Sequence, residues 1–529
     1  MAAAETSSDW KKKESFGSAI LQIAVVGAVL AGGFYFFHQK NQTKKEVAEK
    51  LKEARMLSLR NNPADLVKTL AQLDEILKLD ASSGESLALA AAIHTDLWMN
   101  HKVAGAEAKA KDFLARAEKT EVRTEDRYGS HALHMIAAGD APGAEKYIED
   151  LRKQGANAAK LFHAQALAYK AQGQLSLART AAVSAMDKAW KDPQYSASFA
   201  EMLLEEGLTL QAMDALAKST SANPEHLRAR VDGAIARLLR KDRMKEAAEF
   251  AADVLARPEA EVTPGLRSRA LAAKAMVFNV EAKWDEALKA ADEGLALNAD
   301  ETWAMLARAE ALAGKKDQGA AAAFEALVGK ARTAPVFYFQ GANALQAMGQ
   351  GPAGMALLDK YEAVFKDIKI PHADGTSTPM LDRDDRYWLA KGDILRTAGK
   401  DDEALAAYDR AISAKNINLI KAYYAKGKIY ADRKDYPKTI EMLENIALPD
   451  GTGQLAEAYM LMGEVMFAKK EWGPGCQNFA YGLTRMKATQ TASREELNKI
   501  LTDVEQQLIK NGQKPIAKVW LEEAKPLIQ

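Results

Sequence analysis

The chain has 529 residues, of which 48% are hydrophobic and 27% are charged. Its 72 Lys and Arg residues are balanced by 72 Asp and Glu residues, which argues against a generally basic nucleic-acid-binding protein. The single cysteine, Cys476, excludes an intramolecular disulfide framework and a cysteine-based zinc site. At about 150 residues per domain the length suggests three or four domains, but the pattern along the chain is not uniform.

The N-terminal region predicts a membrane anchor. A basic tail, residues 1–15, is followed by residues 16–37, which read FGSAILQIAVVGAVLAGGFYFF and carry no charge. As a helix this run would extend about 33 Å, enough to cross the hydrocarbon core of a bilayer. The alternative is a cleaved signal peptide with Val29-Leu30-Ala31 as its cleavage site. However, the run continues through four aromatic residues that resemble an interfacial belt, so we expect one uncleaved transmembrane helix.

The orientation of this predicted span is less clear, because lysines flank it on both sides. A short basic tail before an apolar run is typical of a signal anchor, which favours export of the remaining chain. The alternative places the remaining chain on the cytoplasmic face. Ala24, Ala28 and Gly32 recur every four residues and form a stripe of small side chains suited to packing against a partner helix in the membrane.

From residue 46 onward the sequence shows helical periodicity and an internal repeat. Ile235 fills one slot of the repeat, and a small residue occupies each of the others: Ala132, Ala166, Ala200, Ala275, Ala307, Ala342, Gly392, Gly427 and Gly463. We call these ten slots the crossing positions. A second small residue usually follows twelve positions later. Bulky residues stand four before the crossing position, except Ser196, and three after it, except Glu310. Because only small side chains let helices approach closely, we expect the two small positions of a unit to face each other.

This pattern resembles the tetratricopeptide repeat (TPR), a helix–turn–helix unit of about 34 residues. The clearest unit contains Trp388, Gly392, Leu395, Ala404, Tyr408 and Ala411. The resemblance covers about residues 46–490. It implies an all-α fold, a right-handed superhelical solenoid of TPR-like helix pairs, here preceded by a single transmembrane helix. Such arrays serve many roles, so the resemblance does not specify a function.

Within the array, the sequence predicts degenerate helix pairs over 46–125, a first repeat segment over 126–366, an insertion loop over 367–385, a second segment over 386–490 and capping helices over 491–529. The insertion contains two prolines and a glycine, so it cannot be regular helix. It is either a tolerated loop on the edge of the solenoid, or a loop that contacts a partner or divides the array into two segments.

The sequence contains no catalytic or cofactor-binding motif. A phosphate-binding glycine-rich loop, a His-Glu-x-x-His motif and a nucleophile elbow are all missing. His131 and His134 lie three residues apart on a predicted helix, but no second ligand motif accompanies them, so we interpret them as a helix-surface pair. We therefore expect no enzyme, no metal and no cofactor.

Other polar residues have structural interpretations. Glu205-Glu206 and Asp384-Asp385 are adjacent in sequence, so each pair diverges on a helix and is expected on a solvated face. Cys476 lies beside Gly475 inside a predicted helix and is expected to be a small buried residue.

The TPR resemblance also implies where a partner would bind. In such repeats the inner groove is lined by first-helix residues three before, one after and four after the crossing position. In the early units these residues are mostly apolar or mixed, and include Leu133, Ile136, His163, Leu167, Lys170, Glu201 and Leu204. The later units mix aromatic, charged and amide side chains, which suits a peptide-binding surface. The predicted partner-binding residues are Arg308, Phe339, Asn343, Asp393, Arg396, Tyr424, Lys428 and Glu464.

Together these patterns predict a single-pass scaffold in a bacterial inner membrane, with its repeats in the periplasm. Protein or peptide partners would bind the concave groove, and no nucleic acid is expected. The scaffold would serve assembly of a cell-envelope machine for secretion, pilus formation, motility or wall synthesis. The alternative is an adaptor or co-chaperone on the cytoplasmic face that regulates a membrane-associated enzyme.

Overall fold

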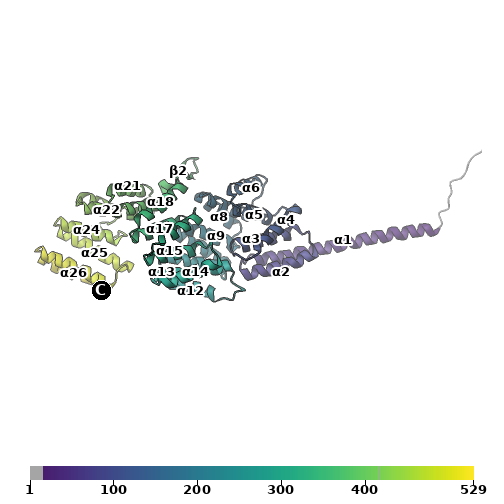
Figure 1. Cartoon of the computed structure of the whole chain (residues 1–529), viewed down its shortest axis with the longest axis horizontal. Coiled ribbons are helices and arrows are strands. Elements are labelled where there is room, and N and C mark those ends of the chain that lie inside the picture. Colours follow the sequence, from purple (N-terminus) through teal and green to yellow (C-terminus); the bar gives the residue numbers. More distant parts are fainter. Residues whose placement is uncertain (1–15, 416–417, 529) are drawn as a thin grey trace, which may run out of the picture.

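The computed structural model describes residues 16–415 and 418–528, and for residues 16–20, 22, 23, 27 and 32 it describes the backbone alone. The predicted basic tail, residues 1–15, lies outside the described residues. The described chain is mainly α-helical. Its helices stack in pairs into an elongated superhelix, from which one long helix projects (Figure 1).

The projecting helix is α1 (Phe16–Ser58), whose 43 residues extend about 65 Å. It runs without a break from the predicted span into the first repeat. Near its C-terminal end, Val47, Leu51 and Ala54 are buried against α2 (Pro63–Leu79) and α3 (Gly84–Met99). Toward its N-terminus the large apolar side chains are exposed, up to 77% for Phe34.

Among the described residues, no helix combines the length and the apolar character needed to cross a bilayer. The structure thus does not show the predicted transmembrane helix over residues 16–37. In the predicted stripe of small residues, Ala24 and Ala28 are exposed on α1, and the surroundings of Gly32 lie outside the described part.

The helix pairs follow one another along the chain. After α1 and α2, the first helices are α3, α5 (Glu125–Ala137), α7 (Ala159–Ala171), α9 (Pro193–Glu206), α11 (Leu227–Arg240), α13 (Pro264–Val280), α15 (Thr302–Gly314), α17 (Pro335–Ala347), α20 (Asp385–Thr397), α22 (Leu419–Asp432) and α24 (Ala456–Ala468). The second helices are α4 (Ala106–Lys119), α6 (Ala141–Lys153), α8 (Leu175–Lys188), α10 (Thr209–Ala222), α12 (Met244–Ala256), α14 (Trp284–Leu297), α16 (Ala320–Lys330), α18 (Gly351–Phe365), α21 (Asp401–Ser413), α23 (Tyr436–Leu443) and α25 (Trp472–Thr489). The pair α26 (Arg494–Lys510) and α27 (Lys514–Ile528) closes the array.

The crossing positions pack as the sequence predicts. A Cβ atom added to Gly354 would lie 2.9 Å from the carbonyl oxygen of Ala342, twelve positions earlier. One added to Gly475 would lie 3.3 Å from the carbonyl oxygen of Gly463, again twelve positions earlier. The alanines at the other crossing positions are fully buried. The close approach of the two helices in a unit is therefore confirmed.

One unit departs from this register. Gly319 stands twelve positions after Ala307, but it is exposed just before α16, and the next residue, Ala320, is fully buried. The reason is a longer turn. Residues 315–319 separate α15 from α16, whereas residues 172–174 separate α7 from α8.

The insertion forms a short hairpin whose base joins the core. Strands β1 (Lys369–Pro371) and β2 (Ser377–Pro379) are antiparallel, with Ile370 opposite Thr378. The following turn of helix, α19 (Met380–Arg383), buries Met380 and Leu381 in the same hydrophobic cluster as the helices on both sides of the insertion.

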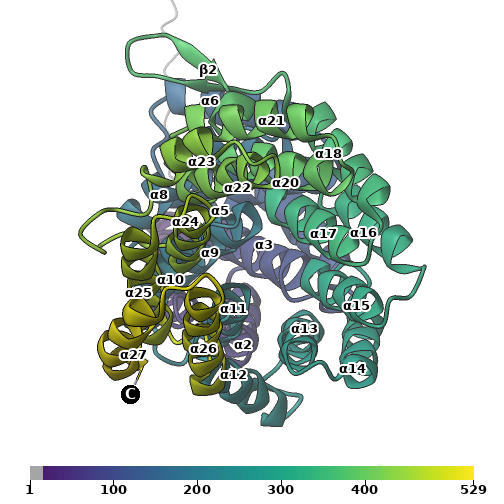
Figure 2. The ribbon, with the colours of Figure 1, turned by 90° about the vertical axis from the view of Figure 1, so that its left-hand side faces the viewer.

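Turns far apart in sequence meet because the superhelix winds back over itself. The Gly265 backbone N–H donates to the His101 carbonyl at 2.9 Å, and the Asn223 side chain donates to the Arg60 carbonyl at 2.7 Å. Further along, the Arg386 guanidinium donates to the carbonyl of residue 206, 180 residues away in sequence. Seen along the axis, α3, α5 and α9 lie inside an outline formed by helices such as α14, α16, α18 and α21 (Figure 2).

Candidate functional site

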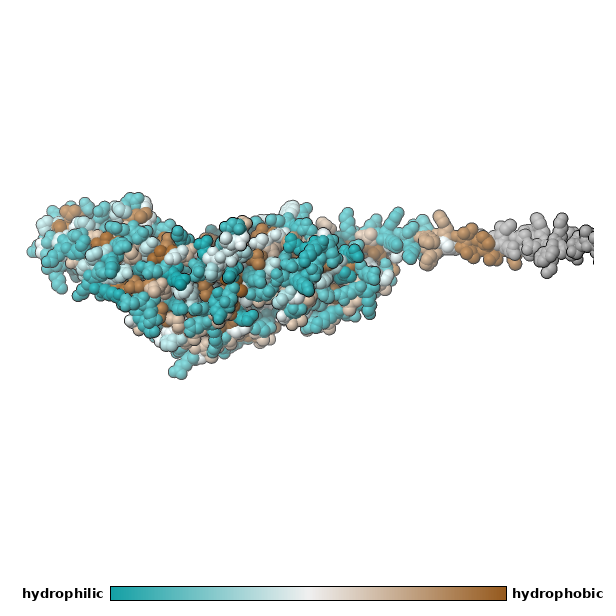
Figure 3. Space-filling view, turned by 90° about the horizontal axis from the view of Figure 1, so that it is seen from above, coloured by the Kyte–Doolittle hydropathy of each residue, from teal (hydrophilic) through white to brown (hydrophobic). Residues whose placement is uncertain are grey.

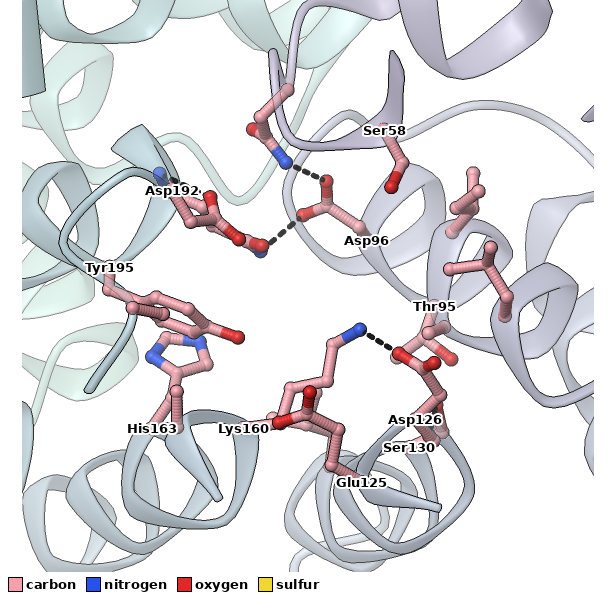
Figure 4. A pocket seen from close by; sticks show the side chains of 18 of the residues that line it. Ser58, Thr95, Asp96, Glu125, Asp126, Ser130, Lys160, His163, Asp192 and Tyr195 are labelled. Carbon is pink, nitrogen blue, oxygen red and sulfur yellow. Dashed lines mark hydrogen bonds and ion pairs between the residues drawn. The ribbon is translucent and has the colours of Figure 1, made fainter. Parts of the chain in front are cut away.

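A cavity opens on the inner face of the first repeats. Neighbouring first helices pack on each other there, α3 on α5 and α5 on α7, whereas α7 and α9 pack less closely. The rings of His163 and Tyr195 stand between α7 and α9 with their centroids 5.4 Å apart. The cavity has a volume of about 270 Å³ and is bounded by these helices, α3 and the turn between α1 and α2. We call it the N-terminal pocket (Figure 4).

Asp126 is the carboxylate in the N-terminal pocket that is paired most completely. It lies in the first turn of α5 and accepts hydrogen bonds from Arg55 of α1, at 2.7 Å, and from Lys160 of α7. Burial alone would raise the pKa of Asp126, but the two cations hold that pKa below its usual value. Burial alone would lower the pKa of Lys160, but the charge of Asp126 outweighs this effect, so the pKa of Lys160 is raised. Both cations of the pocket thus pair with Asp126, and Arg55 also lies 4.0 Å from Glu85.

Asp96, on α3, is held by neutral groups instead. The side-chain amides of Asn61, Asn100 and Gln194 donate to it at 3.2, 2.6 and 3.0 Å. His101 Nε2 lies 3.7 Å from its Oδ2, but burial lowers the pKa of that imidazole, so His101 is neutral at pH 7. The charge of Asp96 therefore has no cation to balance it within the pocket wall.

Two further carboxylates face the same space. Asp192 precedes α9 and accepts the Gln194 backbone N–H at 3.0 Å. Burial raises the pKa of Asp192 to about 7. The Gln194 N–H and the charge of Lys160 oppose that rise, and the charges of Asp96 and Glu125 add to it. Glu125 is exposed at the rim and makes no ion pair with any described residue. Figure 4 shows Glu125, Lys160 and Asp192 arranged around one central space.

His163 and Tyr195 are buried without hydrogen-bond partners. They are 6% and 5% exposed, and among the described residues neither finds a donor or acceptor for its polar atoms. Burial lowers the pKa of His163 to about 4 and raises the pKa of Tyr195 well above its usual value, so both are neutral at pH 7. The Tyr195 hydroxyl points into the cavity (Figure 4).

Next to the N-terminal pocket, an ion-pair network crosses the inner face. Arg269 on α13 contacts Glu201 of α9 at 2.5 Å, Asp232 of α11 at 3.3 Å and Glu301 before α15 at 3.4 Å. Arg228 on α11 also contacts Glu201, at 2.5 Å. Burial would raise the pKa of Glu201, but the two guanidinium groups outweigh it and lower that pKa. This network joins four successive units through charged side chains of α9, α11, α13 and the start of α15.

Three of the predicted partner-binding residues are placed in different environments. Arg308 forms an ion pair with Asp292 of α14 at 2.8 Å. Phe339 is 8% exposed, and its ring centroid lies 4.9 Å from that of Tyr361, so it offers a partner almost no exposed surface. Asn343 is exposed on α17.

The other five lie on three successive first helices, α20, α22 and α24: Asp393, Arg396, Tyr424, Lys428 and Glu464. Burial raises the pKa of Tyr424, and the charges of Glu464 and Arg396 act on it in opposite directions. Burial also raises the pKa of Glu464, and Lys428 opposes that rise. The structure thus gathers Arg396, Tyr424, Lys428 and Glu464 in one electrostatic neighbourhood, and partner binding there stays a prediction.

The expectation of solvated faces for the two acidic pairs is wrong. Glu205, Glu206, Asp384 and Asp385 are between 3% and 8% exposed. Packing between units and the meeting of distant turns bury them, and each has a polar partner. These partners are Lys170, Arg179, Arg386 and the Asn418 backbone N–H.

The two histidines on α5 have separate partners. His131 contacts Glu118 at 2.8 Å, and His134 contacts Thr95 at 3.0 Å. Within the described part of the chain, no three His, Cys, Asp or Glu side chains form a group suited to a metal. Cys476 is half-buried against the C-terminal helices, and burial raises the pKa of its thiol to about 11.

Sequence reasoning found part of the N-terminal pocket and missed the rest. His163, Leu133 and Leu167 were among the early groove positions and line the cavity. Two of its charged members, Asp126 and Lys160, lie six residues before a crossing position, about one helical turn before the first groove position of the unit. The same offset gives Gln194 in the pocket and, in other units, Arg269, Glu301, Arg386, Lys421 and Glu457. A survey of that offset would have found Asp126 and Lys160, but not Asp96, Glu125 or Asp192.

No family model and no curated protein sequence matches the chain. Solved structures with a similar arrangement include a human IFIT1 dimer with PPP-AAAA, at 14% identity and a TM-score of 0.42, covering 76% of this chain and 94% of that one. The Cut9–Hcn1 hetero-tetramer of the APC/C matches at 12% identity and 0.39, covering 84% and 95%. A tetratricopeptide repeat protein from Parabacteroides merdae matches at 17% and 0.28, covering 57% and 97%.

These identities and scores are low, so the description of the fold rests on the chain itself. Its helices pair, the small residues at the crossings are buried, and the pairs stack into a superhelix. These features define a TPR-like α-solenoid.

Proposed function

We propose that this chain is a membrane-tethered TPR-like scaffold without catalytic activity, which binds a protein partner on the inner face of its superhelix. The observation that carries the proposal is the N-terminal pocket, where the largely buried side chains of Tyr195 and His163 present polar atoms to the open cavity that have no partner among the described residues. A polar segment bound in the cavity would give these atoms the hydrogen bonds that buried polar groups in proteins normally make.

The tether is supported by the free end of α1. Between Leu21 and Phe37, the large apolar side chains that the structure describes are 56% to 77% exposed. They form an apolar surface on the projecting helix, away from the repeats (Figure 3). An apolar surface of this kind marks an interaction site, and the cluster of aromatic residues at 34–37 suits the headgroup level of a bilayer. We assign this surface to lipid.

The proposed setting is a bacterial inner membrane with the repeats in the periplasm. There the scaffold would assemble or stabilise a cell-envelope machine for secretion, pilus formation, motility or wall synthesis. The signal-anchor form of the N-terminus supports this orientation. The opposite orientation would make the chain an adaptor or co-chaperone on the cytoplasmic face that regulates a membrane-associated enzyme.

Fractionation of cells tests the tether. The wild-type chain is expected to remain in the membrane pellet after alkaline carbonate extraction. The double variant Val26→Asp with Leu30→Asp is expected in the supernatant, because a charged side chain is costly in the bilayer core. Leu210→Asp, at an exposed apolar position on α10, is the matched control and should stay in the pellet. Recovery of wild-type chain in the supernatant would refute the tether. Alkaline phosphatase fused after residue 529 reports the orientation, since it is active only after export.

Site-specific crosslinking tests partner binding. A photo-reactive amino acid is placed at Leu133, which lines the N-terminal pocket, and at Glu149, an exposed position on the outer helix α6, as the control. Crosslinked proteins are identified by mass spectrometry. A partner captured from position 133 and not from 149 supports the scaffold, and equal capture from both positions argues against a specific site. The double variant Arg396→Glu with Lys428→Glu tests partner binding at the C-terminal groove. We expect it to co-purify with a different set of proteins from the wild-type chain.

A further inference from the structure

The wall of the N-terminal pocket carries more negative than positive charge. Its cationic side chains are Arg55 and Lys160, and both pair with Asp126. Three further carboxylates line the pocket: Asp96, Glu125 and Asp192. None of these three forms an ion pair with a lysine or arginine of the described chain. Because the pKa of Asp192 is raised to about 7, the wall has an excess of between one and two negative charges near pH 7, so an anionic ligand would be repelled and a cationic one attracted.

The unpartnered neutral groups add acceptors to this field. The Tyr195 hydroxyl oxygen and one nitrogen of the neutral His163 ring accept hydrogen bonds, and both side chains present aromatic rings on which a cation is also stabilised. An alkylammonium group has three donors and a guanidinium has five, with no acceptor. Such a group would satisfy the carboxylate at Asp192 and the hydroxyl at Tyr195 together.

Size and surroundings indicate a side chain rather than a larger ligand. The volume of about 270 Å³ lies below the range of about 300–1,000 Å³ that is usual for drug-sized ligands. Apolar residues also line the cavity, including Leu133 and Leu167. Lysine and arginine bury their aliphatic stems on such surface while the charged end finds acceptors.

We propose that the N-terminal pocket binds the cationic end of a lysine or arginine side chain, presented by a partner segment that lies along the inner face. This inference rests on the proposed scaffold function and specifies its partner. Glu125 at the rim steers the cation, Asp192 and Asp96 neutralise it, and Tyr195 accepts one of its hydrogen bonds.

The experiment uses the full chain in lipid nanodiscs and a fluorescein-labelled, end-blocked pentapeptide Gly-Gly-Lys-Gly-Gly, followed by fluorescence anisotropy at low ionic strength. Peptides with arginine, norleucine or glutamate at the central position are compared. Lysine or arginine is expected to bind at least about tenfold more tightly than norleucine, because the pocket wall would otherwise keep uncompensated carboxylates. Glutamate should bind least. Equal binding of lysine and norleucine peptides, or no binding of any peptide, would overturn the inference.

Variants assign the binding to the pocket. Asp192→Asn keeps the cap of α9 but removes a charge, and Glu125→Gln removes the rim charge; each should weaken the lysine peptide about tenfold. Glu149→Gln, on the outer helix α6, is the control and should leave the affinity unchanged. Circular dichroism melting checks that the variants fold. If both pocket variants bind as wild type does, the pocket is not the cation site.

Competition separates the two sources of such a cation. The diamine putrescine should displace the lysine peptide only at concentrations well above those at which the unlabelled peptide does. Displacement at equal or lower concentration would overturn the assignment to a peptide side chain in favour of a free amine. The scaffold proposal has its own readout. A partner crosslinked from position 133 without any preference for lysine would leave the scaffold standing and remove this inference.

Discussion

Glu310 stands three residues after Ala307, where the other aligned units have a bulky side chain. In the structure it is partly buried on α15, and its carboxylate lies 3.5 Å from the Asn279 side-chain amide on α13. Burial raises the pKa of Glu310 to about 7, and the Asn279 hydrogen bond and the charge of Lys241 only partly oppose that rise. A carboxyl group has thus replaced a packing residue and brought a desolvation cost with it.

This cost gives the first prediction. The folded-state pKa of Glu310 lies above its unfolded value of about 4.3, so the folded chain binds the proton more tightly, and the associated stability is lost as pH rises through about 7. Glu310→Gln removes the dependence. The gain in stability of the variant over wild type should be about 2–3 kcal/mol larger at pH 8 than at pH 5, because most of the change occurs between the unfolded and the folded pKa. Urea unfolding at both pH values measures this, and an identical difference at both would contradict it.

The candidate site shows what single positions reveal. His163, Leu133 and Leu167 followed from the repeat register and do line the N-terminal pocket. Asp126 and Lys160 did not follow from the repeat register, because the TPR pattern assigns no role to the helical turn in which they lie. Asp96 and Tyr195 were also missed, since the gap between α7 and α9 that exposes them depends on packing between units and not on any local motif.

At the scale of elements, the helix crossings were the most predictable feature, because a small residue is required wherever two backbones approach closely. Helix ends were less predictable. The longer turn before α16 shifts the buried position from Gly319 to Ala320. The unbroken course of α1 through residues 38–45 was not foreseen either, because the sequence there changes from apolar to charged without a helix breaker.

The second prediction concerns a crossing. A Cβ atom added to Gly392 on α20 would lie 2.5 Å from Cε1 of Tyr408 on α21, and this ring is fully buried and held by a hydrogen bond from its hydroxyl to Asp393. Gly392→Ala should therefore destabilise the chain by about 1–3 kcal/mol.

Gly329→Ala is the matched control, since a Cβ atom there would meet nothing within 4 Å near the end of α16. It should be neutral or stabilising by up to about 1 kcal/mol, as expected from helix propensity alone. Thermal unfolding followed by circular dichroism compares the pair. A Gly392→Ala variant that melts with wild type would show that α20 and α21 do not pack as closely as described.

At the scale of the whole molecule, the repeat pattern predicts contacts between neighbouring units only. The structure adds contacts between turns 163 to 180 residues apart. These follow from the rotation that accumulates over successive units, which no single repeat encodes. Burial at one such contact raises the pKa of Glu206 to about 7, although Arg179 and Arg386 oppose the rise. Hence the buried acidic pairs looked like surface residues in the sequence.

Arg386 provides the test of this long-range closure. Its guanidinium pairs with Asp384 and donates a hydrogen bond to the backbone carbonyl of residue 206. It also lies so close to Gly207 that a Cβ atom added there would be 3.0 Å from it. Arg386→Met keeps the length of the side chain but leaves Asp384 without its cation, and so should loosen the contact between α20 and the end of α9. Amide hydrogen exchange at residues 207–209 should then accelerate about tenfold or more, a change in opening free energy of about 1.4 kcal/mol.

Arg410 on α21 forms an exposed ion pair with Asp382 of α19. Arg410→Met controls for loss of charge and should leave exchange at residues 207–209 unchanged. The two sides of the contact are far apart in sequence, so the position of the effect decides the question. In one outcome, Arg386→Met exchanges faster on both sides of the contact, near residues 207–209 and near 361–386, and has a larger radius of gyration in solution scattering. This result would show that the contact holds the turns of the superhelix together. Faster exchange confined to residues 361–386 would show that Arg386 stabilises its own repeat and that the winding is maintained by helix packing between neighbours alone.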